Sequence, residues 1–178
     1  IAGWTRAQAS EVYEAVRLGI SSSELLKGKW REAYGKIEIF NNSSVIVPLS
    51  KEARKTGDGT NPSVGIVDEY HAHETSEIYD VLYSCMVARK EPLRFIITTA
   101  GCELERPCYR EYEYVSDILD PDSGVENDDY FVMICELDEG DDIKDESNWI
   151  KANPIVATYE EGLELIRSAI RVALYQPV

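Results

Sequence analysis

The stretch Ser63-Val64-Gly65-Ile66-Val67-Asp68-Glu69-Tyr70-His71 decides the fold prediction for the whole chain. Its middle is a short run of Val and Ile that ends in two acids. Such a run, set among loops and helices, is typical of a buried strand in a parallel sheet. Because parallel sheets bind their ligands just beyond the carboxyl ends of the strands, Asp68 and Glu69 are predicted to lie at a ligand site.

A second apolar run, 93–99, is also predicted to be a strand. Two neighbouring strand tips, one with carboxylates and one with hydroxyls, form the site expected for nucleotide hydrolysis. Asp68 would hold a magnesium ion or its water shell, and Glu69 would orient or deprotonate the attacking water. A hydroxyl of Thr98 or Thr99 would sense the γ-phosphate. The alternative is that the acids only cap a helix beginning a few residues later.

Four motifs resemble, in the same order, those of the large terminase subunit of tailed bacteriophages and prophages. Ile66–His71 is similar to a Walker B motif, and Phe95–Gly101 is similar to the coupling motif that follows it in that family. Asp58–Ser63 and Trp149–Pro154 also match the family in order. The resemblance covers most of the chain, and four motifs in sequence are more specific than any one of them.

The resemblance implies an α/β fold of the P-loop NTPase (RecA/ASCE) type, with a mostly parallel sheet and flanking helices, incomplete in this chain. It implies ATP hydrolysis with Mg²⁺ that drives the packaging of DNA into procapsids. Asp68 would be the magnesium-associated carboxylate and Glu69 the catalytic one. Thr98, Thr99 and Gly101 would couple hydrolysis to movement.

Related packaging motors also use an arginine ahead of the Walker B strand that reaches a neighbouring subunit's nucleotide. Arg54 lies at that place in a polar loop, with Lys55 beside it, and is the candidate for this trans-acting role. A solvated loop cation is the alternative. The family implies a homo-oligomeric motor whose partners are DNA, a small terminase subunit and a portal protein. Its place would be the cytoplasm of the bacterial host, transiently at the procapsid portal.

The phosphate-binding loop of a P-loop ATPase, Gly-x-x-x-x-Gly-Lys-Ser/Thr, does not occur in this sequence. Gly57-Asp58-Gly59 is glycine-rich but is not followed by Lys-Ser/Thr. We therefore expect a fragment, with the loop upstream of Ile1 and a nuclease domain downstream of Val178. The expected division is 1–137 for the ATPase core and 138–178 for the helical C-terminal part of the ATPase domain, leading to a linker. Alone, such a fragment is expected to be inactive.

The net charge of −15 has the wrong sign for gripping DNA over a broad surface. DNA contacts are therefore expected from local loops or from segments outside this chain. No run approaches the ~18 apolar residues of a membrane span, so the sequence predicts no such span. The four cysteines lack the Cys-x-x-Cys spacing of a zinc site and are expected to be reduced thiols of a cytosolic protein.

His71 and His73 form a His-x-His pair next to the acids. A metal site is one interpretation of the pair. Zinc is the weaker interpretation, because the sequence shows no third ligand at a recognisable spacing.

Two other functions stay open. Asp68-Glu69-Tyr70-His71 also fits the Asp-Glu-x-His box of superfamily-2 helicases, and Thr98-Thr99-Ala100 loosely resembles their Ser-Ala-Thr motif. Against a helicase, Trp149–Pro154 has no counterpart there. The charge of −15 favours instead a non-enzymatic acidic interaction module derived from an ATPase.

Hydrophobic periodicity predicts strands that alternate with helices, the pattern of an α/β fold with a mostly parallel sheet. Asn41-Asn42 predicts a hairpin turn between two antiparallel strands. The predicted strands are a strand end at 1–3 and the runs 36–40, 44–49, 64–67, 93–99 and 130–137. The predicted helices are one capped by Thr5 and ending at Gly19, then 23–29, 75–88, 104–119, one around Trp149, and 159–174.

Overall fold

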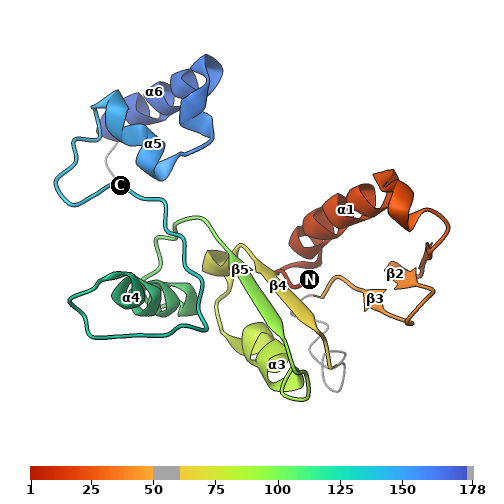
Figure 1. Ribbon diagram of the computed structural model, residues 1–178. Helices are drawn as coiled ribbons and strands as arrows, with labels where there is room; N and C mark the ends of the chain where they lie inside the picture. The colour runs from red at the N-terminus through yellow and green to blue at the C-terminus, as the bar shows by residue number, and fades with distance from the viewer. Residues whose placement is uncertain (50–60, 176–178) are drawn as a thin grey trace. The chain divides into compact units, whose positions relative to one another are not determined.

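The computed structural model describes residues 1–49 and 61–175. It divides into two compact units, Ile1–Val125 and Glu126–Val178, and each is described by itself (Figure 1). The division falls earlier than the boundary after residue 137 that the sequence predicts. Arg54, the candidate trans-acting arginine, lies outside the described residues.

The first unit is built on a parallel arrangement of strands. β4 (Val64–Asp68) pairs in parallel with β5 (Leu93–Ile97), and the two run side by side in Figure 1. On the other edge of β4, Ala2 bridges to Val67 and to Leu49, both in parallel. The N–H of Ala2 donates to the carbonyl of Ile66 over 2.6 Å. The strand end predicted at 1–3 and the parallel character of the sheet are therefore confirmed.

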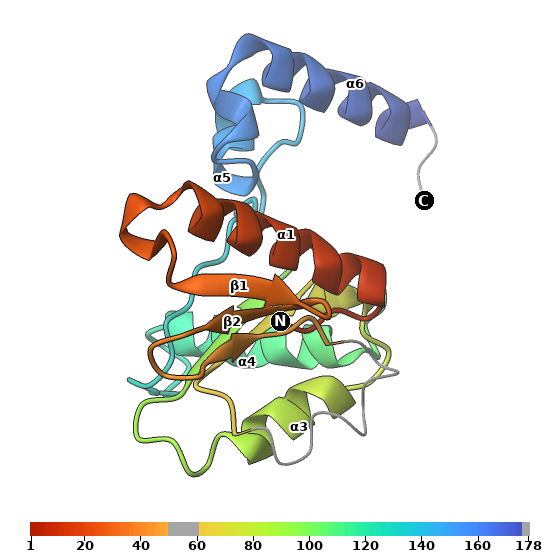
Figure 2. The same cartoon turned by 90° about the vertical axis from the view of Figure 1, so that its right-hand side faces the viewer.

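A helix and an antiparallel sheet follow the first strand segment. Helix α1 (Arg6–Ser22) starts at Thr5, whose side chain closes a capping box, and it continues through Gly19, where the sequence predicted its end. A short 3₁₀ turn, η1 (Glu24–Leu26), replaces the helix predicted over 23–29. Figure 2 shows α1 lying along the antiparallel strands, and the Tyr13 hydroxyl donates to Glu32 Oε1 over 3.2 Å. The three strands are β1 (Trp30–Ala33), β2 (Lys36–Ile39) and β3 (Val45–Ile46).

The predicted hairpin between β2 and β3 is confirmed, whereas β1 was not predicted. Gly3 explains how the chain can leave the parallel sheet and enter α1 at once. A Cβ at Gly3 would lie 2.6 Å from the backbone nitrogen of Ala9. Because that nitrogen belongs to the first turns of α1, a side chain there would force the helix away from the strand.

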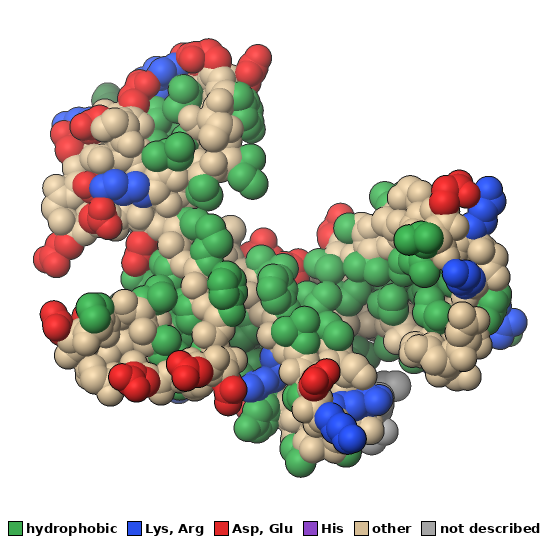
Figure 3. All heavy atoms as spheres, viewed as in Figure 1, with side chains coloured by type: hydrophobic (Ala, Val, Ile, Leu, Met, Phe, Trp, Pro, Cys, Tyr) green, Lys and Arg blue, Asp and Glu red, His purple; other side chains and the backbone are tan. Residues whose placement is uncertain are grey.

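The core of the first unit lies between the parallel strands and helix α3 (Glu77–Cys85). A buried cluster is formed by Ala2, Val67, Tyr70, Ile78 and Leu82. The opposite face of the strands is apolar but half-exposed, and Figure 3 shows hydrophobic side chains gathered over this region. That face carries Val64, Leu93, Phe95 and Ile97. Helix α4 (Pro107–Leu119) follows β5, with its proline in the first turn as predicted.

In the described part of the second unit, the helices all lie after residue 145. The unit contains η4 (Glu146–Asn148), α5 (Trp149–Ala152), η5 (Val156–Thr158) and α6 (Glu160–Tyr175). The strand predicted over 130–137 is wrong, since this segment pairs with no strand among the described residues. Phe131 and Met133 are 89% and 72% exposed there. Alternating apolar residues favour a strand, but a strand also needs a neighbour to pair its backbone groups.

No helix in the described ranges is both long enough and apolar enough to cross a bilayer.

Candidate active site

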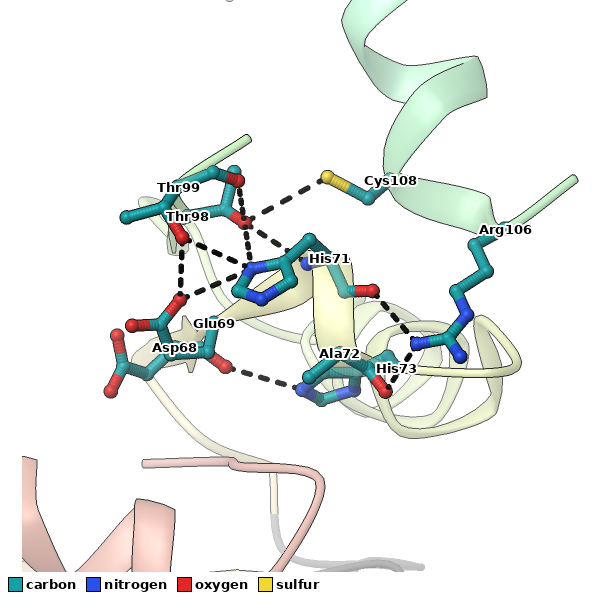
Figure 4. A network of polar contacts seen from close by, with 9 residues as sticks. All are labelled: Asp68, Glu69, His71, Ala72, His73, Thr98, Thr99, Arg106 and Cys108. Carbon is teal, nitrogen blue, oxygen red and sulfur yellow. Dashed lines mark hydrogen bonds and ion pairs between the residues drawn. The ribbon is translucent and has the colours of Figure 1, made fainter. Parts of the chain in front are cut away.

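The site begins with a sharp turn at the tip of β4. Asp68 is the last residue of the strand, and Glu69 adopts a left-handed conformation with φ 49° and ψ 52°. A non-glycine residue in this region costs about 1–3 kcal/mol, and such strain is concentrated at functional sites. The turn leads into η3 (Tyr70–Ala72) and directs the Glu69 side chain toward the tip of β5 (Figure 4).

Glu69 is bound by two side chains through a single carboxylate oxygen. The Thr99 hydroxyl donates to Glu69 Oε2 over 3.3 Å, and His71 Nδ1 lies 3.1 Å from the same oxygen. The Glu69 and His71 side chains are 38% and 28% exposed, so solvent screens this contact in part. Within the described residues, no partner contacts the other oxygen, Oε1. One oxygen of the carboxylate is therefore held and the other is open.

Thr98 ties the backbone of η3 to the tip of β5. The N–H of His71 donates to Thr98 Oγ1 over 3.0 Å, and His71 Nδ1 lies 3.1 Å from the same hydroxyl. Thr98 in turn donates to the carbonyl of Thr99 over 2.9 Å. Hydrogen bonds thus join the turn that carries the acids to the strand tip that carries the threonines (Figure 4).

The start of α4 contacts the same turn from another side. Arg106, the residue before the first helical position of α4, donates from Nη1 to the carbonyls of His71 and Ala72 over 3.2 and 3.3 Å. The Cys108 thiol donates to Thr98 Oγ1 over 3.8 Å. Burial raises the pKa of Cys108, so it stays a neutral thiol near pH 7.

His73 lies under the turn and is fully buried. Its Nε2 is 3.2 Å from the carbonyl oxygen of Asp68, and its ring packs against Trp4 and Tyr70 at centroid distances of 5.7 and 5.5 Å. Burial lowers the pKa of His73, so the imidazole is neutral near pH 7. Since a carbonyl only accepts, Nε2 must carry the proton, and Nδ1 has no hydrogen-bond partner among the described residues.

The side chains of the two histidines face different groups. His71 faces Glu69 and the threonines, whereas His73 faces the backbone of Asp68 (Figure 4). Among the residues that the structure describes, no group of three or more His, Cys, Asp or Glu is placed to hold a metal ion. The zinc interpretation, already the weaker one, gains no support.

The structure brings together five of the predicted site residues, Asp68, Glu69, Thr98, Thr99 and Gly101, at two adjacent strand tips. Asp68 is partly exposed, and its carboxylate makes no hydrogen bond or ion pair with a described residue. It is therefore the group left available to a metal ion or its water shell.

The model of the ATPase domain of the terminase large subunit matches residues 1–117. The chain belongs to the terminase large subunit family. The model of the endonuclease domain of the same subunit matches residues 124–178. The second match falls on the segment that the sequence assigned to the helical end of the ATPase domain, and it begins close to the division between the two compact units.

The terminase chain is 43% identical to protein YmfN of Escherichia coli (strain K12) over 117 residues, which is 65% of this chain and 25% of YmfN. The crystal structure of the HK97 bacteriophage large terminase is similar with a TM-score of 0.73 and 19% identity, covering 96% of this chain and 35% of that one. This likeness confirms the predicted α/β fold of the P-loop ATPase type. The chain thus spans about a quarter to a third of the length of these two proteins.

The sequence did not indicate the roles that three residues have at this terminase site. His71 and His73 were noticed only as a pair, and Arg106 was not noticed at all. The position of His71 directly after the strand-tip acids is a signal that it lies near Glu69. Arg106 gives no such signal, because its partners are backbone carbonyls of residues far away in sequence.

Proposed function

We propose that this chain is part of the motor of a terminase large subunit that hydrolyses Mg-ATP to package DNA into procapsids. The observation that carries the proposal is the bound and left-handed Glu69 at the tip of β4, held by Thr99 from the tip of β5. Membership of the terminase family supports the reaction class. The activity belongs to the complete large subunit, whereas these residues alone are expected to be inactive.

Asp68 and Glu69 would have different roles in ATP hydrolysis. Carboxylate oxygens are the hard ligands that Mg²⁺ prefers, often through water, and the free carboxylate of Asp68 fits that ion. When bound with ATP, Mg²⁺ would neutralise charge on the phosphates. Glu69 would take a proton from the attacking water through Oε1, the oxygen that no described residue binds.

Thr98, Thr99 and Gly101 would couple hydrolysis to movement. Thr99 contacts the Glu69 carboxylate directly, and Thr98 contacts the backbone of the following turn. A change at the γ-phosphate that moves Glu69 would therefore displace the tip of β5. Arg106 would pass the displacement on to α4, because it binds the same turn.

The wider assembly follows from the same proposal. A homo-oligomeric motor would let Arg54 act on the nucleotide of a neighbouring subunit, where an arginine finger can raise the rate ~10³-fold or more. The small terminase subunit, the portal protein and DNA would be its partners in the host cytoplasm. The net charge of −15 favours DNA contacts through segments outside this chain.

We also propose that the second compact unit leads from the ATPase domain toward the nuclease domain. It is matched by the endonuclease model, yet in its described part helices are the only regular secondary structure and no cluster of metal-binding side chains occurs. This agrees with the expected helical segment before a linker better than with a nuclease centre.

DNA packaging into procapsids by the complete large subunit and its partners tests the proposed function. Glu69→Gln should abolish ATP-driven packaging. Glu105→Gln is the matched control, because Glu105 is an exposed acid on the connection between β5 and α4, and it should package like the wild type. Normal packaging by Glu69→Gln would overturn the proposal.

A further inference from the structure

The geometry points to His71 as a positioning residue for the Glu69 carboxylate, joining it to both threonines of the β5 tip. This inference rests on the proposed function, because it assumes that Glu69 acts on the attacking water. His71 itself would not touch the nucleotide. Its contribution is to fix which oxygen of Glu69 is held and which one is open.

The protonation of His71 follows from its partners. Glu69 Oε2 can only accept a hydrogen bond, and the Thr98 hydroxyl already donates its proton to the carbonyl of Thr99. His71 Nδ1 lies 3.1 Å from each of these two oxygens, so Nδ1 must carry the proton and share it between them. The two histidines of the chain are therefore opposite tautomers, Nδ1–H in His71 and Nε2–H in His73.

Two donors then converge on one oxygen of Glu69. The Thr99 hydroxyl and His71 Nδ1–H both reach Oε2. A carboxylate fixed in this way cannot rotate to exchange its oxygens without breaking both bonds. The open oxygen, Oε1, keeps a constant direction, and alignment of a general base with its water is a large part of its catalytic effect.

Gly101 provides the space in which His71 sits. A Cβ at Gly101 would lie 2.9 Å from the Cβ of His71. Because both atoms are fixed by their backbones, the contact cannot be relieved by a rotamer change. The place of Gly101 among the predicted coupling residues is thereby given a physical reason, namely close approach to His71.

The tautomers can be measured on the 178-residue chain without any activity. Imidazole ¹⁵N spectra near pH 7.5 should show one histidine protonated at Nδ1 and one at Nε2, and His71→Asn should remove the Nδ1–H signal. If the signal removed by His71→Asn came from an Nε2–H tautomer, the hydrogen-bond assignment would be wrong.

Steady-state ATPase kinetics of the complete large subunit test the role itself. His71→Ala should lower kcat about tenfold with little change in KM for ATP, since it removes one partly screened, charge-assisted hydrogen bond. His71→Asn should recover most of the rate, because its Nδ2–H₂ can donate from nearly the same place as Nδ1. Gly101→Ala should resemble His71→Ala, whereas Gly19→Ala, with open space around it, should behave like the wild type.

A double variant separates this inference from the proposed function. If Glu69→Gln keeps a measurable residual rate and adding His71→Ala lowers that residual rate no further, His71 acts through Glu69; a further drop of about tenfold would show that His71 acts independently of Glu69. If Glu69→Gln is inactive but His71→Ala has the wild-type kcat, the inference about His71 fails and the proposed function stands. If Glu69→Gln hydrolyses ATP like the wild type, both fail. A general loss of folding would appear as a lower melting temperature in both His71 variants, without rescue by Asn, and would also overturn the positioning role.

Discussion

Thr98 and Thr99 are neighbours in sequence but bind different parts of the site. Thr99 donates to the carboxylate of Glu69, whereas Thr98 accepts from the backbone of His71 and donates to a backbone carbonyl. The first contact acts on the proposed chemistry and the second on the connection between the two strand tips. Replacing each hydroxyl by a methyl group should therefore give different defects.

Thr98→Val should uncouple hydrolysis from movement. The side chain keeps its shape, but the turn after Glu69 loses a hydrogen-bond partner from the tip of β5. We expect the variant to hydrolyse ATP several-fold more slowly, or to consume more ATP for each base pair packaged. The measurement is the ratio of ATP hydrolysed to DNA packaged by the complete motor. An unchanged ratio together with normal packaging would remove Thr98 from the coupling path.

His73 should make the stability of the chain depend on pH. Burial lowers its pKa, so the folded chain resists a proton that the unfolded chain binds near pH 6.5. The free energy of unfolding should then fall between pH 7 and 5, by at most ~1.4 kcal/mol per pH unit. His73→Gln keeps a neutral donor near the position of Nε2 and should flatten this dependence, whereas His71→Asn should keep it. Urea unfolding at the two pH values measures it, and equal slopes in wild type and His73→Gln would contradict the assignment.

At the scale of single elements, the sequence patterns predicted the elements that depend only on neighbouring residues. The tips of β4 and β5, the β2–β3 hairpin and the first turn of α4 follow from apolar runs, a turn signal and a proline. β1 was missed because Trp30–Ala33 has exposed charges at both central positions and no alternation to reveal it. The left-handed Glu69 could not be predicted either, since its strain is maintained by contacts with a distant strand.

The segment 130–137 shows the limit of the same reasoning. Its composition favours a strand, but strand formation depends on a pairing partner that no local pattern supplies. Arg106 is a similar case at the site, because its hydrogen bonds join residues that are distant in sequence. The site predicted from the sequence therefore lacks those residues that only long-range contacts bring to it.

Burial of Leu82 against β4 should stabilise helix α3 in its position. Leu82 is 5% exposed and belongs to the central cluster, whereas Leu25 in η1 is 80% exposed. Leu82→Ala should lower the free energy of unfolding by about 2–5 kcal/mol, the usual cost of a core Leu→Ala change. Leu25→Ala should change it by less than about 0.5 kcal/mol. Urea midpoints of the two variants provide the comparison, and equal shifts would show that α3 does not dock in this way.

At the scale of the whole molecule, the acids and the threonine tip are present but the sequence contains no phosphate-binding loop. Backbone amides and the lysine of such a loop supply most phosphate affinity in this class of ATPase. The net charge of −15 also repels a nucleoside triphosphate. We therefore expect isothermal calorimetry of the 178-residue chain with Mg-ATP to detect weak binding or none. Micromolar affinity would reopen Gly57-Asp58-Gly59, outside the described residues, as a phosphate contact.

The central claim is that Glu69 is the catalytic carboxylate of a terminase ATPase site, and one comparison tests it most directly. Nucleotide affinity and the rate of phosphate release are measured on the complete large subunit as wild type and as Glu69→Gln. We expect the Glu69→Gln variant to bind Mg-ATP within about threefold of the wild-type affinity and to turn over at least ~10²-fold more slowly, because the general base is lost while binding groups remain. Phosphate release by Glu69→Gln at the wild-type rate would contradict the account.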